Sequence, residues 1–283
     1  MSERCSDVSR AAGESLVATA TVAEHWLLLE VREGWSRDVG TSGAVSGAAR
    51  ASVSAWLERT PRSRLLFIRR PARTAGPRLV FVVHAPESGG VVRRFELGTL
   101  DDLAAADLAA GGEEHGAPLV LVCGHGSRDA CCALRGTAVF GALAPGLGDD
   151  EVWISSHQGG HRFAANVIVL PAAVHLGRVD PSEAQRVGGR ALAGEIDLGR
   201  YRGRTCYSAP VQAAEHAVRS AHGLERLDDL RLVQHSGTTV RFRDAEGSEH
   251  AAEVTETPGP SVPVGCGSDP EPQPAFAVRL LRG

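Results

Sequence analysis

Apolar and polar residues along the first hundred positions follow two distinct periods. Short runs rich in Val, Ile, Leu and Phe, such as HWLLLEV and RLVFVVHA, are typical of strands. Stretches with apolar residues every three or four positions, such as AARASVSAWLER, are typical of helices. Thr99 precedes the last such stretch and is its expected N-cap. The pattern predicts strands at residues 25–31, 63–70, 78–85 and 91–98, with helices at 48–59 and 99–110.

The following segment repeats this β-α-β-β-β-α order. Its last helix has a good start signal, because Asp180 precedes Pro181 and Glu183 occupies the third helical position. The loop at residues 31–38 of the first unit offers no cysteine, so we interpret that unit as a scaffold or partner surface. The pattern predicts strands at 118–124, 151–157, 166–171 and 173–179, with helices at 136–144 and 181–194. We therefore expect an α/β protein containing a tandem of two thioredoxin-like units.

The pattern changes near residue 200, where we expect a small α+β extension. Alternating residues joined by the turn sequence DAEG are typical of a hairpin. The stretch at residues 258–274 is rich in Pro and Gly and is either an ordered wrap or a flexible loop. The predicted elements are a helix at 209–223 and strands at 229–236, 238–244, 248–256 and 275–281. The expected domains are residues 1–115, 116–200 and 201–283.

Composition narrows the function classes. The 283 residues are 43% hydrophobic with a net charge of −4, which suits a globular protein without a basic block for nucleic acid. No apolar run is long enough to cross a membrane, and the N-terminus lacks the apolar region of a signal peptide. We expect a cytoplasmic protein with no nucleic-acid or membrane partner. Its thiols should stay reduced, so cysteine clusters should bind metal or do redox work.

Two pairs of residues have the spacing of metal ligands. Cys123 and Cys132 are separated by eight residues, and His157 and His161 by three, each pair after a strand-like run. Loops at neighbouring strand ends can bring these four donors to one point. Two thiolates and two imidazoles match the ligand set of a Rieske-type [2Fe–2S] cluster. Cys131, adjacent to Cys132, leaves the register of the first pair open.

The charge of this ligand set has a functional consequence. Replacing two thiolates by neutral imidazoles removes two negative charges, so the reduction potential should exceed that of an all-cysteine ferredoxin. The potential should also fall with rising pH, because an imidazole bound to ferric iron loses its second proton more easily. No nucleotide-binding G-x-G-x-x-G run follows a strand, so a separate reductase must supply electrons to such a carrier.

Three sequence runs resemble the sucrase/ferredoxin-like family: CGHGSRDACC, SSHQGGHRFAANVIVLP and GESLVATATVAEHWLLLEVREGW. The resemblance implies a thioredoxin-like ferredoxin domain of the bis-histidine branch. It assigns Cys123, Cys132, His157 and His161 as ligands of a [2Fe–2S] cluster and favours Cys132 over Cys131. The expected function is one-electron transfer between a separate reductase and an acceptor protein. The chain has no carboxylate pair in a convincing glycosidase setting, so sucrase activity has no support.

Other interpretations stay open beside the cluster. The same four residues could hold structural or sensory zinc, although eight intervening residues exceed the usual finger spacing. A thioredoxin-like thiol oxidoreductase using Cys131 or Cys132 would lack the C-x-x-C motif. Cys5, Cys131, Cys206 and Cys266 have no spacing partner and are interpreted as packed thiols, with their roles undetermined.

Five further side chains near the candidate ligands have two interpretations each. His125 is a hydrogen-bond donor to the site or an ordinary loop residue, and Arg128 and Asp129 form an ion pair or a solvated pair. Arg162 contacts a redox partner or lies on the surface. Trp153 is expected in the core, with a role in electron transfer as the alternative. Three more tryptophans, Trp26, Trp35 and Trp56, should pack the first unit.

Overall fold

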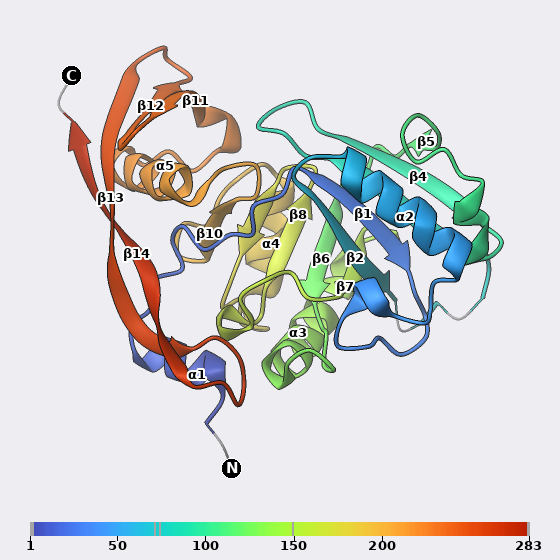
Figure 1. The fold of residues 1–283 in the computed structure, drawn as a ribbon. Coiled ribbons are helices and arrows are strands. Elements are labelled where there is room, and N and C mark those ends of the chain that lie inside the picture. Colours follow the sequence, from blue (N-terminus) through green and yellow to red (C-terminus); the bar gives the residue numbers. More distant parts are fainter. Residues whose placement is uncertain (1–2, 71, 74, 149, 282–283) are drawn as a thin grey trace.

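The computed structural model describes residues 3–70, 72–73, 75–148 and 150–281. Within these residues, five α-helices accompany a ten-stranded mixed sheet and a four-stranded antiparallel sheet (Figure 1). The helices are α1 (Cys5–Ala11), α2 (Gly47–Arg59), α3 (Ala130–Leu143), α4 (Ala184–Leu192) and α5 (Ala209–His222). The short 3₁₀ segments are Val39–Thr41, Leu100–Ala104, Ala144–Gly146, His161–Phe163 and Leu227–Asp229. The architecture confirms the predicted mixed α/β class.

The large sheet is built from two halves with the same strand order. Its order is β10-β9-β8-β6-β7-β2-β1-β3-β4-β5. In each half the first strand pairs in parallel with the second and antiparallel with the third. The halves join antiparallel where Ile68 of β2 faces Ser155 of β7. The first half comprises β1 (His25–Glu30), β2 (Ser63–Arg69), β3 (Arg78–His84), β4 (Val91–Leu97) and β5 (Glu113–Glu114). The second comprises β6 (Leu119–Cys123), β7 (Val152–Ser155), β8 (Val167–Leu170), β9 (Val174–Leu176) and β10 (Tyr201–Arg204).

Helices cover both faces of this sheet. Val53 and Trp56 of α2, together with α3 and α4, pack against one face. Helix α5 and the small sheet cover the other, where Trp26 and Trp153 are fully buried. Trp35 is also buried, which confirms the prediction that these aromatic residues belong to the core. Successive residues of each strand point to opposite faces of the sheet. Because both faces are covered, the apolar runs of these strands are nearly continuous.

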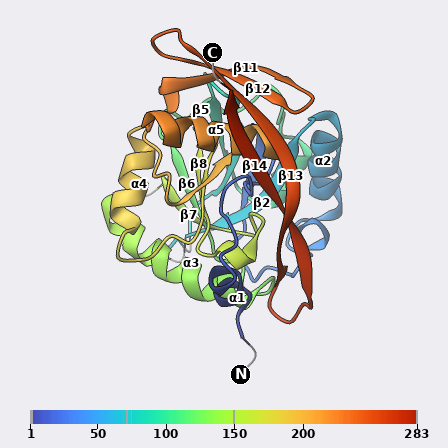
Figure 2. The ribbon, with the colours of Figure 1, turned by 90° about the vertical axis from the view of Figure 1, so that its left-hand side faces the viewer.

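The C-terminal strands form a long ribbon that runs back to the N-terminus. The small sheet contains β11 (Leu230–Ser236), β12 (Thr239–Asp244), β13 (Glu249–Pro263) and β14 (Pro270–Leu281). Figures 1 and 2 both place the turn between β13 and β14 at the same end of the molecule as α1. The proline-rich stretch is therefore ordered, which settles the choice that the sequence left open.

Several sequence-based predictions differ from the structure. The predicted helix at 99–110 shrinks to the 3₁₀ turn Leu100–Ala104. The Asp107 carboxylate accepts hydrogen bonds from the N–H groups of Ala109 and Ala110, and this local turn competes with a helix. Helix α3 starts at Ala130 rather than at residue 136, so Cys132 lies in its first turn and not in a loop. Helix α1 and strands β5 and β10 were not predicted.

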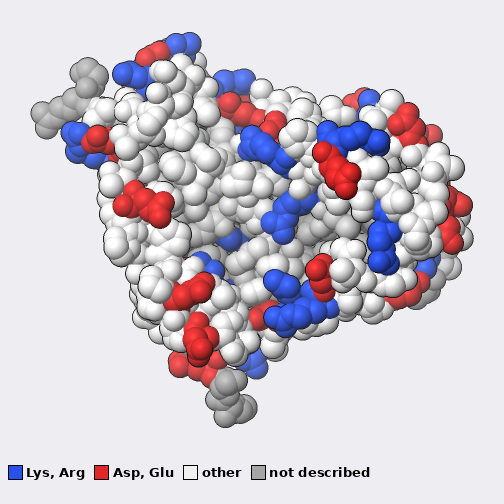
Figure 3. Space-filling model, in the orientation of Figure 1, with Lys and Arg blue, Asp and Glu red and all other residues white. Residues whose placement is uncertain are grey.

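Surface charge is mixed on the face shown in Figure 3. Acidic and basic side chains alternate over this face, and several basic ones lie in the hollow at its centre. No helix in the part of the chain that the structure describes is both long and apolar enough to span a bilayer.

Candidate metal centre

The candidate ligands lie where β6 and β7 end. These strands pair in parallel, and Cys123 at the end of β6 faces Ser155 at the end of β7. Because parallel strands end at the same edge of a sheet, the two following loops meet there. The first loop leads into α3, and the second leads to the 3₁₀ turn that begins at His161.

The structure brings the predicted donors together. One ligand atom from each of Cys123, Cys132 and His157 lies within 4.8 Å of the others. The ring of His161 stacks on that of His157, with ring centroids 4.4 Å apart. Both cysteines are buried, whereas both histidines are partly exposed. The sulfur side of the centre therefore faces the protein interior and the imidazole side faces the surface.

Two glycines shape the histidine loop. Gly159 has a φ of 102° and Gly160 a φ of 69°, and residues with a Cβ rarely adopt either value. A Cβ on Gly160 would also lie 2.7 Å from Nη2 of Arg202. Only glycine therefore lets the chain turn between the two histidines while staying in contact with its support.

A buried hydrogen-bond network holds the histidine loop in place. Nη1 of Arg202 donates to the carbonyl oxygen of Gly159 at 3.0 Å and to Oδ1 of Asn166 at 2.8 Å. The Asn166 amide donates in turn to the carbonyl oxygen of Gly160 at 2.9 Å. Nε2 of Gln158 donates to the carbonyl oxygen of Leu121 at 2.7 Å. These hydrogen bonds fix the position of the histidine loop.

His125 joins the two ligand loops to the first half of the molecule. Its ring is buried, and its Nε2 lies 2.9 Å from the carbonyl oxygen of Ser36. The N–H of His157 donates to its Nδ1 at 3.2 Å. The Ser36 contact requires a proton on Nε2, which leaves Nδ1 as the acceptor. His125 is therefore a positioning residue for His157, and the loop at residues 31–38 is its support.

Arg162 and Asp129 have roles other than those considered from the sequence. Arg162 is largely buried and pairs with Glu14 at 2.8 Å. It also donates to Oε1 of Gln273 at 2.8 Å, so it is not a surface arginine. The Asp129 carboxylate caps α3 by accepting from the N–H of Cys131 at 2.8 Å.

Electrostatics favour the metal-binding forms of Cys123 and His161. A hydrogen bond with Cys132, with a further contribution from His157, lowers the pKa of Cys123 well below its usual value, and the pKa of Cys132 rises in return. Burial lowers the pKa of His161 to about 4, so its ring is neutral near pH 7. Thiolate and neutral imidazole are the forms that bind metal.

Two orphaned nitrogen atoms provide a test of whether a metal group fits here. Nδ1 of His157 and Nδ1 of His161 are buried and have no hydrogen-bond partner among the described residues. Unpartnered buried nitrogens are costly unless something else binds them. Together with the two buried sulfur atoms, they form a donor set that fits a [2Fe–2S] cluster of the bis-histidine type.

A second donor group lies beside the first and was missed at the level of sequence. Cys5, Asp129, Cys131 and Cys266 each offer a ligand atom within 4.8 Å of the others. Their sequence separations follow no known ligand spacing. The only signal was that three cysteines had no explanation.

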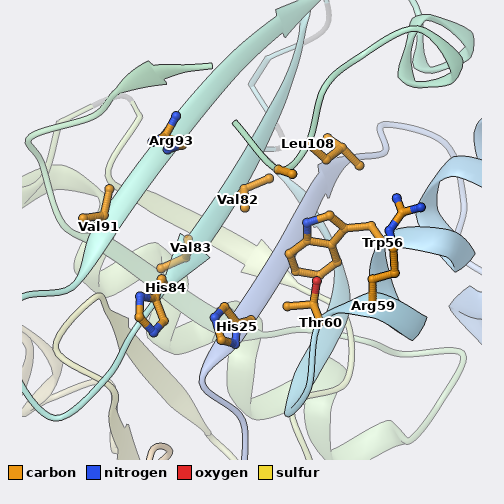
Figure 4. A pocket seen from close by; sticks show the side chains of 11 residues that line it. His25, Trp56, Arg59, Thr60, Val82, Val83, His84, Val91, Arg93 and Leu108 are labelled. Carbon is orange, nitrogen blue, oxygen red and sulfur yellow. The ribbon is translucent and has the colours of Figure 1, made fainter. Parts of the chain in front are cut away.

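A separate cavity lies in the first half of the molecule. This cavity of about 480 Å³ lies between β1, the end of α2 and the β3–β4 hairpin (Figure 4). Trp56 and Arg59 line it, as do His25 and His84, whose rings stack 4.4 Å apart. None of the four predicted ligands lines this cavity.

Comparison with known proteins now defines the class. The sucrase/ferredoxin-like family model matches residues 16–203, so the chain belongs to the sucrase/ferredoxin-like family. Among curated relatives, Altered inheritance of mitochondria protein 32 from Eremothecium gossypii is 37% identical over 116 residues, covering 40% of this chain and 34% of that protein.

Proteins of the same name from two other organisms give similar matches. The Meyerozyma guilliermondii protein is 34% identical over 95 residues, covering 30% of this chain and 34% of that protein. The Debaryomyces hansenii protein is 34% identical over 101 residues, covering 32% of this chain and 37% of that protein. The matches thus span about a third of the length of these relatives. No solved structure matches the chain.

Proposed function

We propose that this protein is a one-electron carrier that holds a [2Fe–2S] cluster through Cys123, Cys132, His157 and His161. The observation that carries the proposal is the convergence of the Cys123, Cys132 and His157 donors, with His161 stacked on His157. Membership of a ferredoxin-like family supports it. When bound, such a cluster supplies reversible one-electron chemistry at a potential above that of all-cysteine ferredoxins.

The cysteines and the histidines would have different roles on the two sides of the centre. The buried thiolates of Cys123 and Cys132 exclude water from the interior side. The partly exposed rings of His157 and His161 form the side that a reductase and an acceptor protein can approach. Gly265 lies against Nε2 of His161, since a Cβ there would be 3.1 Å from that nitrogen. Its missing side chain leaves room for a proton on Nε2.

Metal and sulfide analysis of the anaerobically purified protein tests the proposal. We expect about two iron and two acid-labile sulfide atoms per chain and a visible absorption that dithionite bleaches. The EPR spectrum of the reduced protein should show nitrogen coupling to iron. The His157→Ala/His161→Ala double variant should lose these signals. The His222→Ala/His235→Ala variant, altered far from the centre, should keep them.

One result would overturn the proposal in favour of structural zinc at these residues. A colourless protein that stays iron-free after reconstitution with iron and sulfide, and whose zinc content drops in Cys123→Ser, would show a mononuclear site. The donor set of two sulfur atoms and two imidazoles is compatible with tetrahedral zinc. Nitrogen-coupled EPR signals exclude that alternative.

A further inference from the structure

The second donor group draws together three segments that are far apart in the chain. Cys5 is the first residue of α1, Asp129 and Cys131 lie at the start of α3, and Cys266 lies in the turn between β13 and β14. We propose that these four residues form a second metal site that binds one zinc ion. This site is separate from the candidate cluster ligands and does not depend on the proposed electron-transfer function.

The distances within the group match a tetrahedral ion. The sulfur atoms of Cys5 and Cys131 are 3.6 Å apart, those of Cys131 and Cys266 3.4 Å, and those of Cys266 and Cys5 3.7 Å. Oδ1 of Asp129 lies 3.3 Å from Sγ of Cys266 and 3.9 Å from Sγ of Cys5. Zinc bonds of 2.3 Å to sulfur and 2.0 Å to oxygen imply edges of about 3.8 Å and about 3.5 Å in a regular tetrahedron.

The chemistry of the donors favours zinc over calcium and magnesium. Three thiolates are soft ligands and exclude calcium and magnesium, which take oxygen ligands. A fourth ligand from a carboxylate completes the closed, four-coordinate shell that structural zinc prefers. A disulfide would use only two of the three sulfur atoms and would require them to be about 2.0 Å apart.

Hydrogen bonds hold the carboxylate in position. The N–H of Cys131 donates to Oδ1 of Asp129 at 2.8 Å, and the N–H of Cys266 donates to Oδ2 at 2.7 Å. Hydrogen bonds of this kind orient metal ligands and are part of functional metal sites. Cys131 also lies in the first turn of a fourteen-residue helix, whose dipole favours a thiolate.

The four donors differ in their exposure to solvent. Cys5 and Cys131 are fully buried and Asp129 nearly so, whereas Cys266 is exposed. The buried donors form a rigid half-site, and the turn that carries Cys266 provides the solvent-facing side through which zinc can arrive.

The position of the site suggests its role. Cys5 and Cys266 lie outside residues 16–203, which the family model matches. The site would therefore connect segments before and after the matched region to Asp129 and Cys131 within it. Gly265 contacts His161 from the same turn that carries Cys266. A zinc ion would therefore clamp α1 and the β13–β14 turn over the candidate cluster centre, as a structural site that closes the molecule.

Zinc analysis of the full-length protein tests this proposal. We expect about one zinc per chain beside the iron, and the same amount in the His157→Ala/His161→Ala variant. Cys266→Ser should lower zinc about tenfold while iron, sulfide and the visible spectrum stay unchanged. Cys206→Ser is the matched control, because Cys206 is a buried thiol outside both donor groups.

Two further variants protect the test against misfolding. Cys266→His restores a zinc ligand and should regain zinc, which a merely structural effect of Cys266→Ser would not explain. Asp129→Asn should weaken zinc retention against a chelator. Cobalt(II), added to chelator-treated protein, should give sulfur-to-cobalt charge-transfer absorption in wild type and not in Cys266→Ser.

Three results would overturn the proposal. One is wild-type protein without zinc after incubation with excess zinc under reducing conditions. Another is full zinc retention in both Cys131→Ser and Cys266→Ser. The third is a disulfide between two of the three cysteines in peptide mapping of the unreduced protein.

Discussion

Two donor groups share the first turn of α3, and they differ in how the chain assembles them. Cys132 contributes to one and its neighbour Cys131 to the other. The first group comes from two loops at adjacent ends of β6 and β7, within a short stretch of sequence. The second needs the N-terminal helix and a turn near the C-terminus. The spacing of residues in a sequence can indicate the first kind of site, but it gives no sign of the second.

The two groups also differ in charge. Two thiolates and two imidazoles make the first group compatible with a centre that changes its charge by one electron. In the forms that bind metal, three thiolates and a carboxylate give the second group two more negative charges, which suits a dication with no redox chemistry. A hydrogen bond with Cys5 lowers the pKa of Cys131 to about 5 and raises that of Cys5, so one thiolate is already present near neutral pH.

The sharpest test of this comparison exchanges one atom at each of two adjacent positions. Cys132→Ser should remove the iron and the visible absorption while zinc stays near one per chain. Cys131→Ser should do the reverse. Metal analysis and absorption of both purified variants measure the outcome, with Cys206→Ser as control. Loss of both metals in both variants would mean that the two groups form a single site.

Removal of zinc should produce the next largest effect. A ligand present at about a thousand times its dissociation constant stabilises the folded state by about 4 kcal/mol. A zinc-selective chelator should therefore lower the thermal midpoint of wild type and of Cys206→Ser. The Cys266→Ser protein should start lower and show no further change. If the chelator lowers the thermal midpoint of Cys266→Ser as much as that of wild type, the zinc ion does not connect α1 to the β13–β14 turn.

The contrast between the two groups also describes what sequence could predict. The strands of the large sheet follow apolar runs, and the ligand loops follow the ends of two of them, so β6, β7 and the first donor group were accessible. The second half of the long β13 was not, because the predicted strand at 248–256 ends before Pro258 and Pro260, which usually exclude strands. Beyond Glu253, β13 has only β14 as a partner, so these prolines occupy a ribbon with a free edge.

Long-range structure accounts for the other misses. Helix α1 carries few strong local signals, and its buried residues pack against segments far away in sequence. Helix α3 begins six residues earlier than predicted because Asp129 caps it, whereas the sequence suggests an ion pair or a solvated pair of Asp129 with Arg128. No local pattern links Cys5 to Cys266, since only the folded ribbon brings them together.

Replacement of one imidazole should change the potential of the first group without emptying it. His161→Cys should keep a cluster and lower its reduction potential by on the order of 100 mV, because a thiolate adds negative charge. Redox titration followed by EPR measures the shift. His235→Cys, on the exposed face of β11, makes the same chemical change away from the centre and should leave the potential unchanged. An unchanged potential in His161→Cys would remove His161 from the ligand set.

The smallest effect should come from the residue that positions the first group. His125→Ala deletes the contacts to the Ser36 carbonyl and the His157 N–H, which should cost about 1–3 kcal/mol of stability. The iron content should stay the same, because His125 offers no ligand atom to either donor group. His125→Gln keeps a donor and an acceptor and should recover part of the loss. Thermal unfolding measures the stabilities of His125→Ala and His125→Gln, with His235→Ala as the control. A loss of iron in His125→Ala that His125→Gln does not restore would make His125 a ligand rather than a support.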